Sequence, residues 1–242
     1  MLQIAIISDI HANSRALEAV LHDIDQRHIA AVYCLGDLVD FAPWGNEVIE
    51  RIRKRGIPTL LGNHDERIAF DEPVVALPHH DAHESANRVL AIQYSKEHIT
   101  ADNKKWMASL PYTMTLRFKV GEQFKSILLV HANLDSNDQY VYEGDDKQEM
   151  AARLKARGID AVFMGHTHLS YVQELDEVLF VNAGSVGRSR EEDRKACYTI
   201  VTLTETEIKV AIVKVDYAID EVAQAIYSSE IPDFYGDFLL QR

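Results

Sequence analysis

Apolar and polar positions along the chain alternate between two patterns, one typical of buried strands and one typical of helices. Short runs of branched apolar residues indicate strands, and apolar residues three and four positions apart indicate amphipathic helices. The predicted strands are Leu2–Ser8, Ala31–Leu35, Ile57–Leu61, Ser126–Val130, Ala161–Met164 and Val178–Val181. The helices predicted between them are Arg15–Arg27, Gly45–Arg55 and Lys147–Arg157. Strands that alternate with helices are typical of a layered α/β fold.

One segment interrupts this alternation, and we interpret it as an inserted helical cap. Residues 66–112 contain a polar, histidine-rich loop and then two stretches with helical spacing, Glu84–His98 and Asp102–Leu110. The sequence has no internal repeat, low-complexity tract or linker-like run. Residues 1–242 are therefore predicted to form a single domain that carries the cap as an insertion.

The C-terminal part, residues 196–242, is predicted to form a hairpin followed by a helix. Two runs of alternating polarity, Ala196–Leu203 and Glu207–Val215, flank a short polar segment. The final helix is predicted at Ala218–Tyr227. The hairpin is a candidate surface for pairing with a second copy of the chain, which would make a homo-oligomer.

The composition is that of a folded globular protein, with 47% apolar and 26% charged residues. A formal net charge of −13 opposes binding to duplex nucleic acid and to anionic membranes. No apolar stretch approaches the ~18 residues that a membrane span needs. No signal-peptide pattern precedes the first strand, so we expect a cytoplasmic protein.

Residue types that bind metal ions occur where the predicted strands end. Five successive strands are each followed by aspartate, asparagine or histidine residues. These are Asp9 and His11, Asp37, Asn63 and His64, His131, and His166 with His168. Because ligands bind beyond the carboxyl ends of strands in open α/β sheets, we expect these side chains to converge. Carboxylate, imidazole and amide-oxygen donors suit manganese, iron, zinc or cobalt better than a soft, thiolate-binding metal.

The spacing within these blocks supports the prediction. Asp9 and His11 are two residues apart, which places both side chains on one side of an extended chain. Glycines precede three of the blocks and allow a sharp turn or a close backbone approach. Each block alone is more often a helix cap or a turn than a metal site. Coincidence across five successive strands is hard to sustain, so we predict a metal site.

The blocks, in this order, resemble the calcineurin-like metallophosphoesterases. The resemblance rests on Asp9-Ile10-His11, Gly36-Asp37, Gly62-Asn63-His64-Asp65, His131 and Gly165-His166-Thr167-His168. Residues 182–187 and 106–111 are also similar to bacterial and archaeal phosphoesterases related to diadenosine tetraphosphatases. The resemblance implies an α/β/β/α sandwich that hydrolyses phosphoesters with two divalent transition-metal ions (Mn, Fe, Zn, Ni or Co).

The resemblance also implies individual roles. Its ligands for one ion are Asp9, His11 and His168, those for the second are Asn63, His131 and His166, and Asp37 bridges the two. His64 would protonate or stabilise the leaving oxygen. Asp40 resembles the carboxylate that orients this histidine, and Asp65 is the less favoured candidate. Such a carboxylate would raise the pKa of the imidazole.

The sequence departs from one branch of the family. Protein serine/threonine phosphatases of the superfamily carry an arginine after the orienting aspartate, but Phe41 follows Asp40 here, which disfavours a phosphoprotein substrate. Arg188 and Arg190 are candidates for contact with phosphate instead. The slightly favoured interpretation is that both are solvated charges in the polar run that follows residue 187.

The histidine-rich loop of the cap offers a further candidate. His79, His80 and His83, with Asp81, are predicted either to donate an extra metal ligand or to line the substrate cleft. A solvated loop is the more common arrangement for such a cluster.

The expected function is hydrolysis of a phosphomonoester, a phosphodiester or a dinucleoside polyphosphate. By analogy at the level of the fold, a helical cap favours a small phosphorylated substrate such as a nucleotide. The alternative is a non-catalytic scaffold that acts through protein partners. Scaffolds of that kind have lost metal ligands or the catalytic histidine, whereas this chain retains both.

Overall fold

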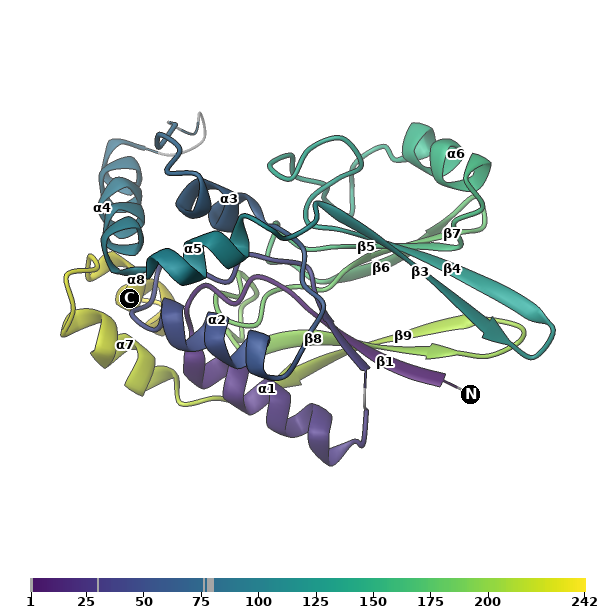
Figure 1. Cartoon of the computed structure of the whole chain (residues 1–242), viewed down its shortest axis with the longest axis horizontal. Coiled ribbons are helices and arrows are strands. Elements are labelled where there is room, and N and C mark those ends of the chain that lie inside the picture. The colour runs from purple at the N-terminus through teal and green to yellow at the C-terminus, as the bar shows by residue number, and fades with distance from the viewer. Residues whose placement is uncertain (1, 30, 76, 78–80) are drawn as a thin grey trace.

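The computed structural model describes residues 2–29, 31–75, 77 and 81–242, and these residues form two β-sheets packed face to face (Figure 1). The first sheet has the order β2-β1-β8-β9, with β1 Leu2–Ile7, β2 Ala31–Cys34, β8 Ala196–Leu203 and β9 Ile208–Val215. The second has the order β3-β4-β5-β7-β6, with β3 Thr113–Val120, β4 Gln123–Val130, β5 Ala161–Met164, β6 Tyr171–Leu175 and β7 Val178–Asn182. The pairs β1–β2, β4–β5 and β5–β7 are parallel, and the other pairs are antiparallel.

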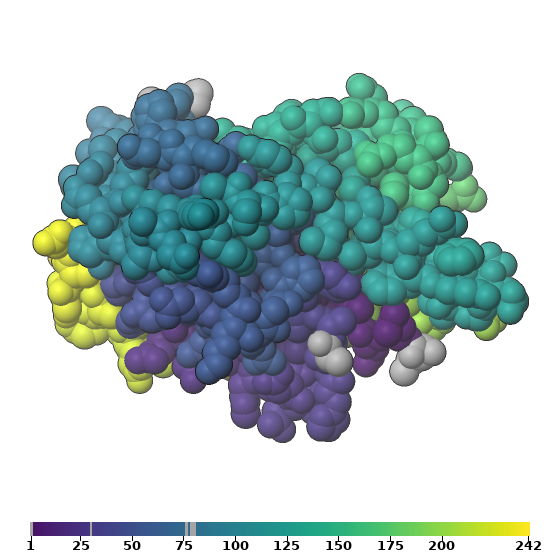
Figure 2. Space-filling view, in the orientation of Figure 1, coloured from purple at the N-terminus to yellow at the C-terminus, as the bar shows by residue number. Residues whose placement is uncertain are grey.

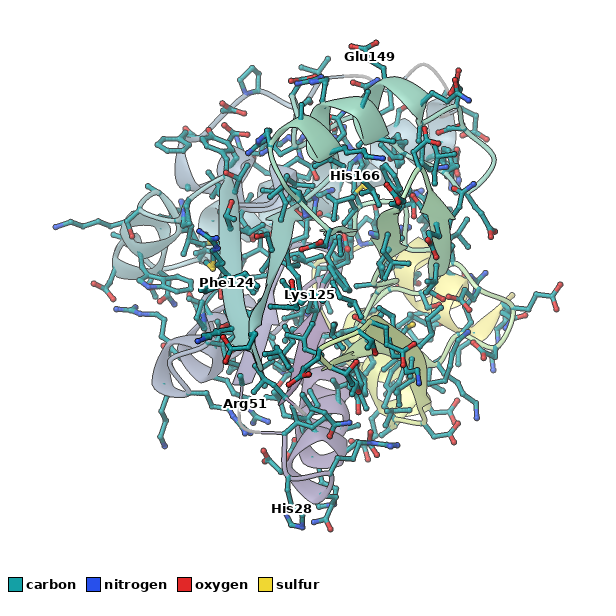
Figure 3. The ribbon with its side chains drawn as sticks, turned by 90° about the vertical axis from the view of Figure 1, so that its right-hand side faces the viewer. His28, Arg51, Phe124, Lys125, Glu149 and His166 are labelled. Atoms are coloured by element: carbon teal, nitrogen blue, oxygen red, sulfur yellow. The ribbon has the colours of Figure 1, made fainter. Side chains whose placement is uncertain are left out.

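Helices cover the outer faces of both sheets. Helices α1 (Ser14–Gln26) and α2 (Gly45–Lys54) pack on the first sheet, and α6 (Gln148–Ala156) packs on the second. Figure 3 shows Glu149 of α6 and His28, just after α1, at opposite extremes of the molecule with the sheets between them. The layers therefore follow the order helix, sheet, sheet, helix, and the predicted α/β/β/α sandwich is confirmed.

The remaining helices gather at one end of the sandwich (Figure 1). They are α3 (Asn63–Ala69), α4 (Ala82–His98), α5 (Ala101–Met107), α7 (Ile219–Tyr227) and α8 (Phe234–Leu240). In Figure 2 the described residues of the cap segment, residues 66–112, cover this end, and C-terminal residues lie below them. Among the described residues, no helix combines the length and apolar character required to cross a lipid bilayer.

Alternating side chains of the strands build the cores between these layers. Ile4 and Ile6 of β1 point into the space between the sheets, where Phe163 of β5 also packs. Ala5 and Ile7 point to the opposite face and pack against α1 and α2. Both faces of β1 and β5 are buried, which explains why these strands appear as continuous apolar runs in the sequence.

The predicted strand Ile57–Leu61 is wrong. The segment runs beside β2 and makes one isolated bridge, between Cys34 and Thr59. Pro58 has no N–H group to donate, and only its carbonyl oxygen pairs, accepting from the Cys34 N–H at 2.9 Å. The chain nevertheless passes beside β2, and this position delivers α3 to the same edge of the sheet as the loop after β2.

Four elements, β3, β6, α3 and α8, lie outside the predicted set. Strands β3 and β6 form the edges of the second sheet, where half-exposed and partly polar sequences are tolerated. Helices α3 and α8 contain seven residues each, about two turns, which is too short to establish a helical period. The predicted hairpin is confirmed as β8 and β9, and the predicted helix Ala218–Tyr227 as α7, although α8 follows it and α7 is not the final helix.

Candidate metal centre

The loops that follow β1, β2, β4 and β5 meet at the end of the sandwich that carries α3 and α4. Backbone hydrogen bonds join them, since the N–H groups of Ile10 and His11 both donate to the Asp37 carbonyl, at 2.8 and 3.0 Å. The loop after β7 is joined as well, because the Val186 N–H donates to the Ser8 carbonyl at 2.9 Å. Strand ends from both sheets therefore contribute to one site.

Several predicted site residues adopt left-handed backbone conformations. They are Asp9, His11, Asp37, Asp40, His166 and His168, with φ between 48° and 72°. Such conformations are uncommon for residues other than glycine and persist where the surrounding structure enforces them, often at functional sites. The hydrogen bonds between the loops enforce them here. The side chains of Asp9 and His11 thus converge through left-handed turns, and not through the extended chain that the sequence predicts.

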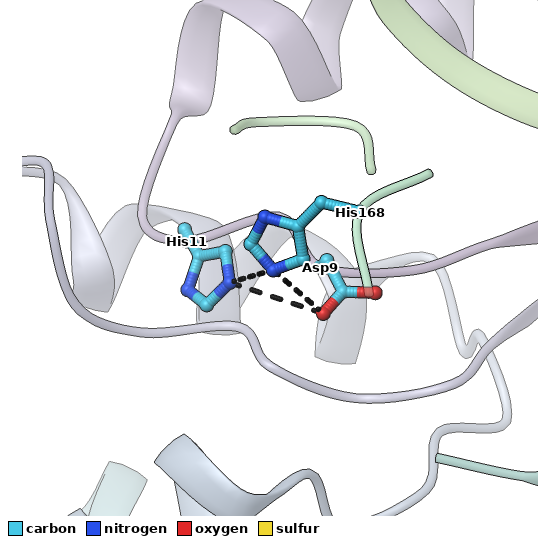
Figure 4. A group of neighbouring side chains, drawn as sticks. All are labelled: Asp9, His11 and His168. Atoms are coloured by element: carbon cyan, nitrogen blue, oxygen red, sulfur yellow. Dashed lines mark hydrogen bonds and ion pairs between the residues drawn. The ribbon is translucent and has the colours of Figure 1, made fainter. Parts of the chain in front are cut away.

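Asp9, His11 and His168 form the first cluster (Figure 4). His168 Nε2 lies 3.0 Å from His11 Nε2 and 3.2 Å from Asp9 Oδ1. The Nδ1–H groups of His11 and His168 donate to the carbonyl oxygens of Val39 and Arg188, at 3.0 and 2.7 Å. Because a carbonyl oxygen only accepts, Nε2 of each neutral ring carries a lone pair that faces the cluster.

Asp37, His131 and His166 form the second cluster, with ligand-type atoms within 4.8 Å of one another. Asp37 Oδ2 lies 3.3 Å from His131 Nε2, and Asn63 Oδ1 lies 3.1 Å from the same nitrogen. Asp37 Oδ2 is also 3.8 Å from His11 Nε2 of the first cluster. The carboxylate of Asp37 therefore borders both clusters.

Three atoms of the clusters lack a hydrogen-bond partner, and they are of the kind that a metal ion would bind. Among the described residues, Asp9 Oδ1, Asp37 Oδ2 and His166 Nε2 are buried without a hydrogen-bond partner, and Figure 3 shows His166 inside the molecule. The other oxygens of the two carboxylates accept backbone N–H groups, Asp9 Oδ2 from His166 at 3.0 Å and Asp37 Oδ1 from His64 at 2.9 Å. Buried polar atoms without partners are costly, and bound cations would compensate them. The donor set thus fits divalent metal ions.

Electrostatics in the metal-free protein divide the histidines into two kinds. Burial lowers the pKa of His11 and of His166 to about 3, so both rings are neutral. Burial alone would also lower the pKa of His131, but the carboxylate of Asp37 raises it to about 10. The same pairing holds the pKa of Asp37 well below its usual value, against the effect of burial. Without metal, His131 and Asp37 therefore form a buried ion pair.

His64 lies beside the clusters and contacts Asp40. Its Nδ1 is 2.5 Å from Asp40 Oδ2. Asp65 is engaged elsewhere, since its carboxylate accepts the N–H groups of Asp37 and Leu38, both at 2.8 Å. The expected rise in the pKa of His64 is wrong for the metal-free protein, because burial lowers it well below its usual value. Burial also raises the pKa of Asp40, to about 7.

Arg188 is not the solvated surface charge that the sequence favours. Its guanidinium carbon lies 4.7 Å from the ring centroid of Phe41 and 4.3 Å from that of Phe238. Its Nε is buried without a hydrogen-bond partner. Burial, with the nearby charge of Arg190, lowers the pKa of Arg188 to about 10, at which the side chain is still cationic at neutral pH. The side chain therefore lies in a box of aromatic rings beside the first cluster.

A cavity of about 240 Å³ borders both clusters. Its lining includes Asp37, Asn63, His64, His166, His168, Arg188 and Arg190. Helix α8 forms one wall through Phe234, Tyr235 and Phe238, which the sequence did not single out. The available signal was three aromatic residues within one five-residue stretch, 234–238.

The described residues of the histidine-rich cluster, Asp81 and His83, make contacts within the cap and with α8. His79 and His80 lie outside the described residues. Asp81 caps helix α4, accepting the Glu84 N–H at 2.8 Å. The ring of His83 packs edge-on against Phe234, with centroids 5.7 Å apart. An extra metal ligand from this loop stays a prediction.

The chain belongs to the calcineurin-like phosphoesterase superfamily. A sequence model described as the calcineurin-like phosphoesterase superfamily domain matches residues 2–206. The family predicted from the motifs is thereby confirmed, and the two clusters of aspartate and histidine are candidate sites for the divalent metals that the family typically binds.

The similarity to other proteins covers nearly the whole chain. An uncharacterized protein of Methanocaldococcus jannaschii is 31% identical, over 98% of this chain and 96% of the relative. A metallophosphoesterase from Sphaerobacter thermophilus has a similar structure, with a TM-score of 0.76, 24% identity and 99% coverage of both chains. A hypothetical protein from Pyrococcus horikoshii has a TM-score of 0.82, 20% identity and coverage of 99% and 98%. The two solved structures share the fold of this chain from end to end, including the part beyond residue 206.

Proposed function

We propose that this chain hydrolyses phosphoesters of small molecules with two bound divalent transition-metal ions. One observation carries the proposal, namely that Asp9 Oδ1, Asp37 Oδ2 and His166 Nε2 are buried without a hydrogen-bond partner and lie in two adjoining clusters. The family supports hydrolysis as the reaction. The substrate classes under the proposal are a phosphomonoester, a phosphodiester and a dinucleoside polyphosphate.

Each cluster would hold one ion. The proposed ligands are Asp9, His11 and His168 for the first ion and Asn63, His131 and His166 for the second, with Asp37 shared. Manganese, iron, zinc, nickel and cobalt all suit this mixture of imidazole, carboxylate and amide oxygen. When bound, two such metal ions activate water and neutralise charge on the phosphoryl oxygens.

The chain's own residues position the substrate and move a proton. In its doubly protonated form His64 would donate the Nε2 proton to the leaving oxygen and become neutral, while Asp40 Oδ2 orients the ring through its 2.5 Å contact with Nδ1. Arg188 binds a phosphoryl oxygen, because its cation lines the cavity beside His168. The walls of the 240 Å³ cavity favour a small substrate over a protein or a nucleic-acid duplex.

Localisation in the cytoplasm and formation of a homo-oligomer stay predictions.

Metal binding is expected to release at least one proton per chain at pH 7.5. An imidazole must be neutral to bind a metal ion. His131, however, is protonated below its pKa of about 10 in the metal-free protein. Metal affinity should therefore rise with pH up to this value. Calorimetric titration in two buffers of equal pH and different ionisation enthalpy measures the release. A binding heat that does not depend on the buffer would contradict the prediction.

The proposed function is tested by removing and restoring metal. The protein is stripped with a chelator and assayed with Mn, Fe, Zn, Ni or Co on p-nitrophenyl phosphate, bis-p-nitrophenyl phosphate and diadenosine tetraphosphate. We expect activity to return only with metal, with two ions per chain at saturation. Two bound ions without turnover of any substrate would reject hydrolysis and support the scaffold alternative, which partner capture would then examine.

A further inference from the structure

The cavity beside the clusters has room for one small group. Its volume of about 240 Å³ lies below the roughly 300–1,000 Å³ typical of pockets that bury drug-sized ligands. Helix α8 closes one side, and Glu84 and Arg88 of α4 contribute to another. Helix α8 lies outside residues 2–206, so it is an addition to the part of the chain that defines the family.

Arg188 brings an uncompensated cation into this cavity. No described carboxylate lies within ion-pair distance of its guanidinium group, which instead contacts the rings of Phe41, Tyr235 and Phe238 at 4.7, 5.5 and 4.3 Å. An arginine over aromatic faces is held in place and keeps its donors available for a planar, two-point contact with an anion. A negatively charged group of the ligand is therefore expected to pair with the Arg188 guanidinium.

The position of Arg188 directs that contact toward the reacting group. The Arg188 carbonyl accepts the Nδ1–H of His168 at 2.7 Å, so the residue is joined directly to the first cluster. The guanidinium shares the lining of one cavity with His168 and of a second, smaller one with His11, which places it beside the metal ligands. A phosphoryl group at the clusters would therefore lie within reach of Arg188.

A second arginine provides an internal comparison. Arg194 stacks on the ring of Phe238 at 4.3 Å, the same distance as Arg188. The Nη1 of Arg194 donates to the Ser189 carbonyl at 3.0 Å, and Arg194 is absent from the lining of the cavity. Both arginines stack on Phe238 of α8, but Arg188 alone of this pair lines the cavity.

Charge distinguishes the candidate substrates. A phosphomonoester carries about −1.5 to −2 charge at pH 7 and three strong acceptor oxygens. Esterification of one of these oxygens leaves a diester with a single negative charge and a bulkier phosphoryl group. A cation fixed beside the clusters, in a small cavity, favours the group with more charge and less bulk.

We propose that the substrate is a small phosphomonoester and that Arg188, held by the aromatic rings of Phe41 and α8, selects it over phosphodiesters. This inference rests on the proposed function and narrows its substrate class. Arg188 binds the phosphoryl oxygen that is charged in a monoester and esterified in a diester.

The test compares two substrates that differ only at that oxygen, p-nitrophenyl phosphate and methyl p-nitrophenyl phosphate. The variants are Arg188→Met, which keeps a long apolar chain against the rings, Arg188→Lys, which keeps the charge, and Arg194→Met as the matched control. In Arg188→Met we expect kcat/KM for the monoester to fall about 10- to 100-fold. The methyl ester should change by less than about threefold. Arg188→Lys should retain part of the preference, and Arg194→Met all of it.

A binding measurement complements the assay. Calorimetric titration of the metal-loaded protein with inorganic phosphate should give a dissociation constant about 10- to 100-fold weaker in Arg188→Met and unchanged in Arg194→Met. Equal losses on both esters, a wild-type preference for the methyl ester, or unchanged phosphate affinity would overturn the selection by Arg188. Turnover of neither ester by the metal-loaded wild type would reject the proposed function itself.

Discussion

Asp37→Asn is expected to lower kcat by about 10³-fold or more and to reduce the metal content from two ions per chain to one or none. The carboxylate borders both clusters, with Oδ2 3.3 Å from His131 Nε2 and 3.8 Å from His11 Nε2. The amide keeps the size of the side chain and an oxygen that can accept the His64 N–H. The substitution therefore removes the negative charge and preserves this hydrogen bond. Elemental analysis and steady-state kinetics on one preparation measure both effects.

The control for this variant is the same chemical change at the surface. Asp135 pairs with Arg153 on an exposed face, and its side chain is 63% exposed. Asp135→Asn should therefore leave metal content and kcat close to those of the wild type. If Asp37→Asn keeps two ions and more than about a tenth of the activity, Asp37 is not a shared ligand.

His64→Asn is expected to lower kcat by about 10²- to 10⁴-fold while the metal content stays at two ions per chain. His64 faces the cavity, but its Nδ1 is engaged with Asp40 and it belongs to neither cluster. Because its proposed task is to protonate the leaving oxygen, the loss should be larger for an alkyl phosphate than for p-nitrophenyl phosphate, whose leaving group needs no proton. Comparing kcat for both esters in both proteins measures this difference.

Two further variants make the result for His64 specific. His28 is exposed and adopts a left-handed conformation that asparagine tolerates, so His28→Asn should leave kcat unchanged. Asp40→Asn should cause a loss no larger than that of His64→Asn, because the imidazole is retained but loses the carboxylate that fixes its tautomer and orientation. Loss of metal from His64→Asn, or an equal loss with both leaving groups, would argue against a proton donor.

Part of the fold could be predicted because burial leaves a clear pattern in the sequence. Strands β5 and β8 are observed at their predicted bounds, since their side chains are buried on both faces. Edge strand β6 and the short helix α8 left no comparable pattern. The apolar run at residues 57–61 was misleading. Pro58 limits its pairing, and the segment makes one isolated bridge with β2 instead of a strand ladder, which the sequence pattern does not show.

The candidate site, like the fold, could be predicted from the sequence only in part. The motifs from Asp9 to His168 are local, and their order places them at strand ends that the topology brings together. The sequence offers two carboxylates for His64, Asp40 and Asp65, and the resemblance favours Asp40. Only the folded loops show that Asp65 binds backbone N–H groups while Asp40 lies 2.5 Å from the ring.

The sequence by itself determined the layered α/β class, the family and the set of residues that converge, because each depends on residue types at fixed local spacing. Tertiary structure alone decided the surroundings of Arg188, the wall that α8 adds and the size of the cavity. Arg188 and Phe238 are 50 positions apart, and no periodicity relates residues whose contact depends on how α8 packs against the loop after β7. The charge that looks solvated in the sequence is partly buried against aromatic rings in the folded chain.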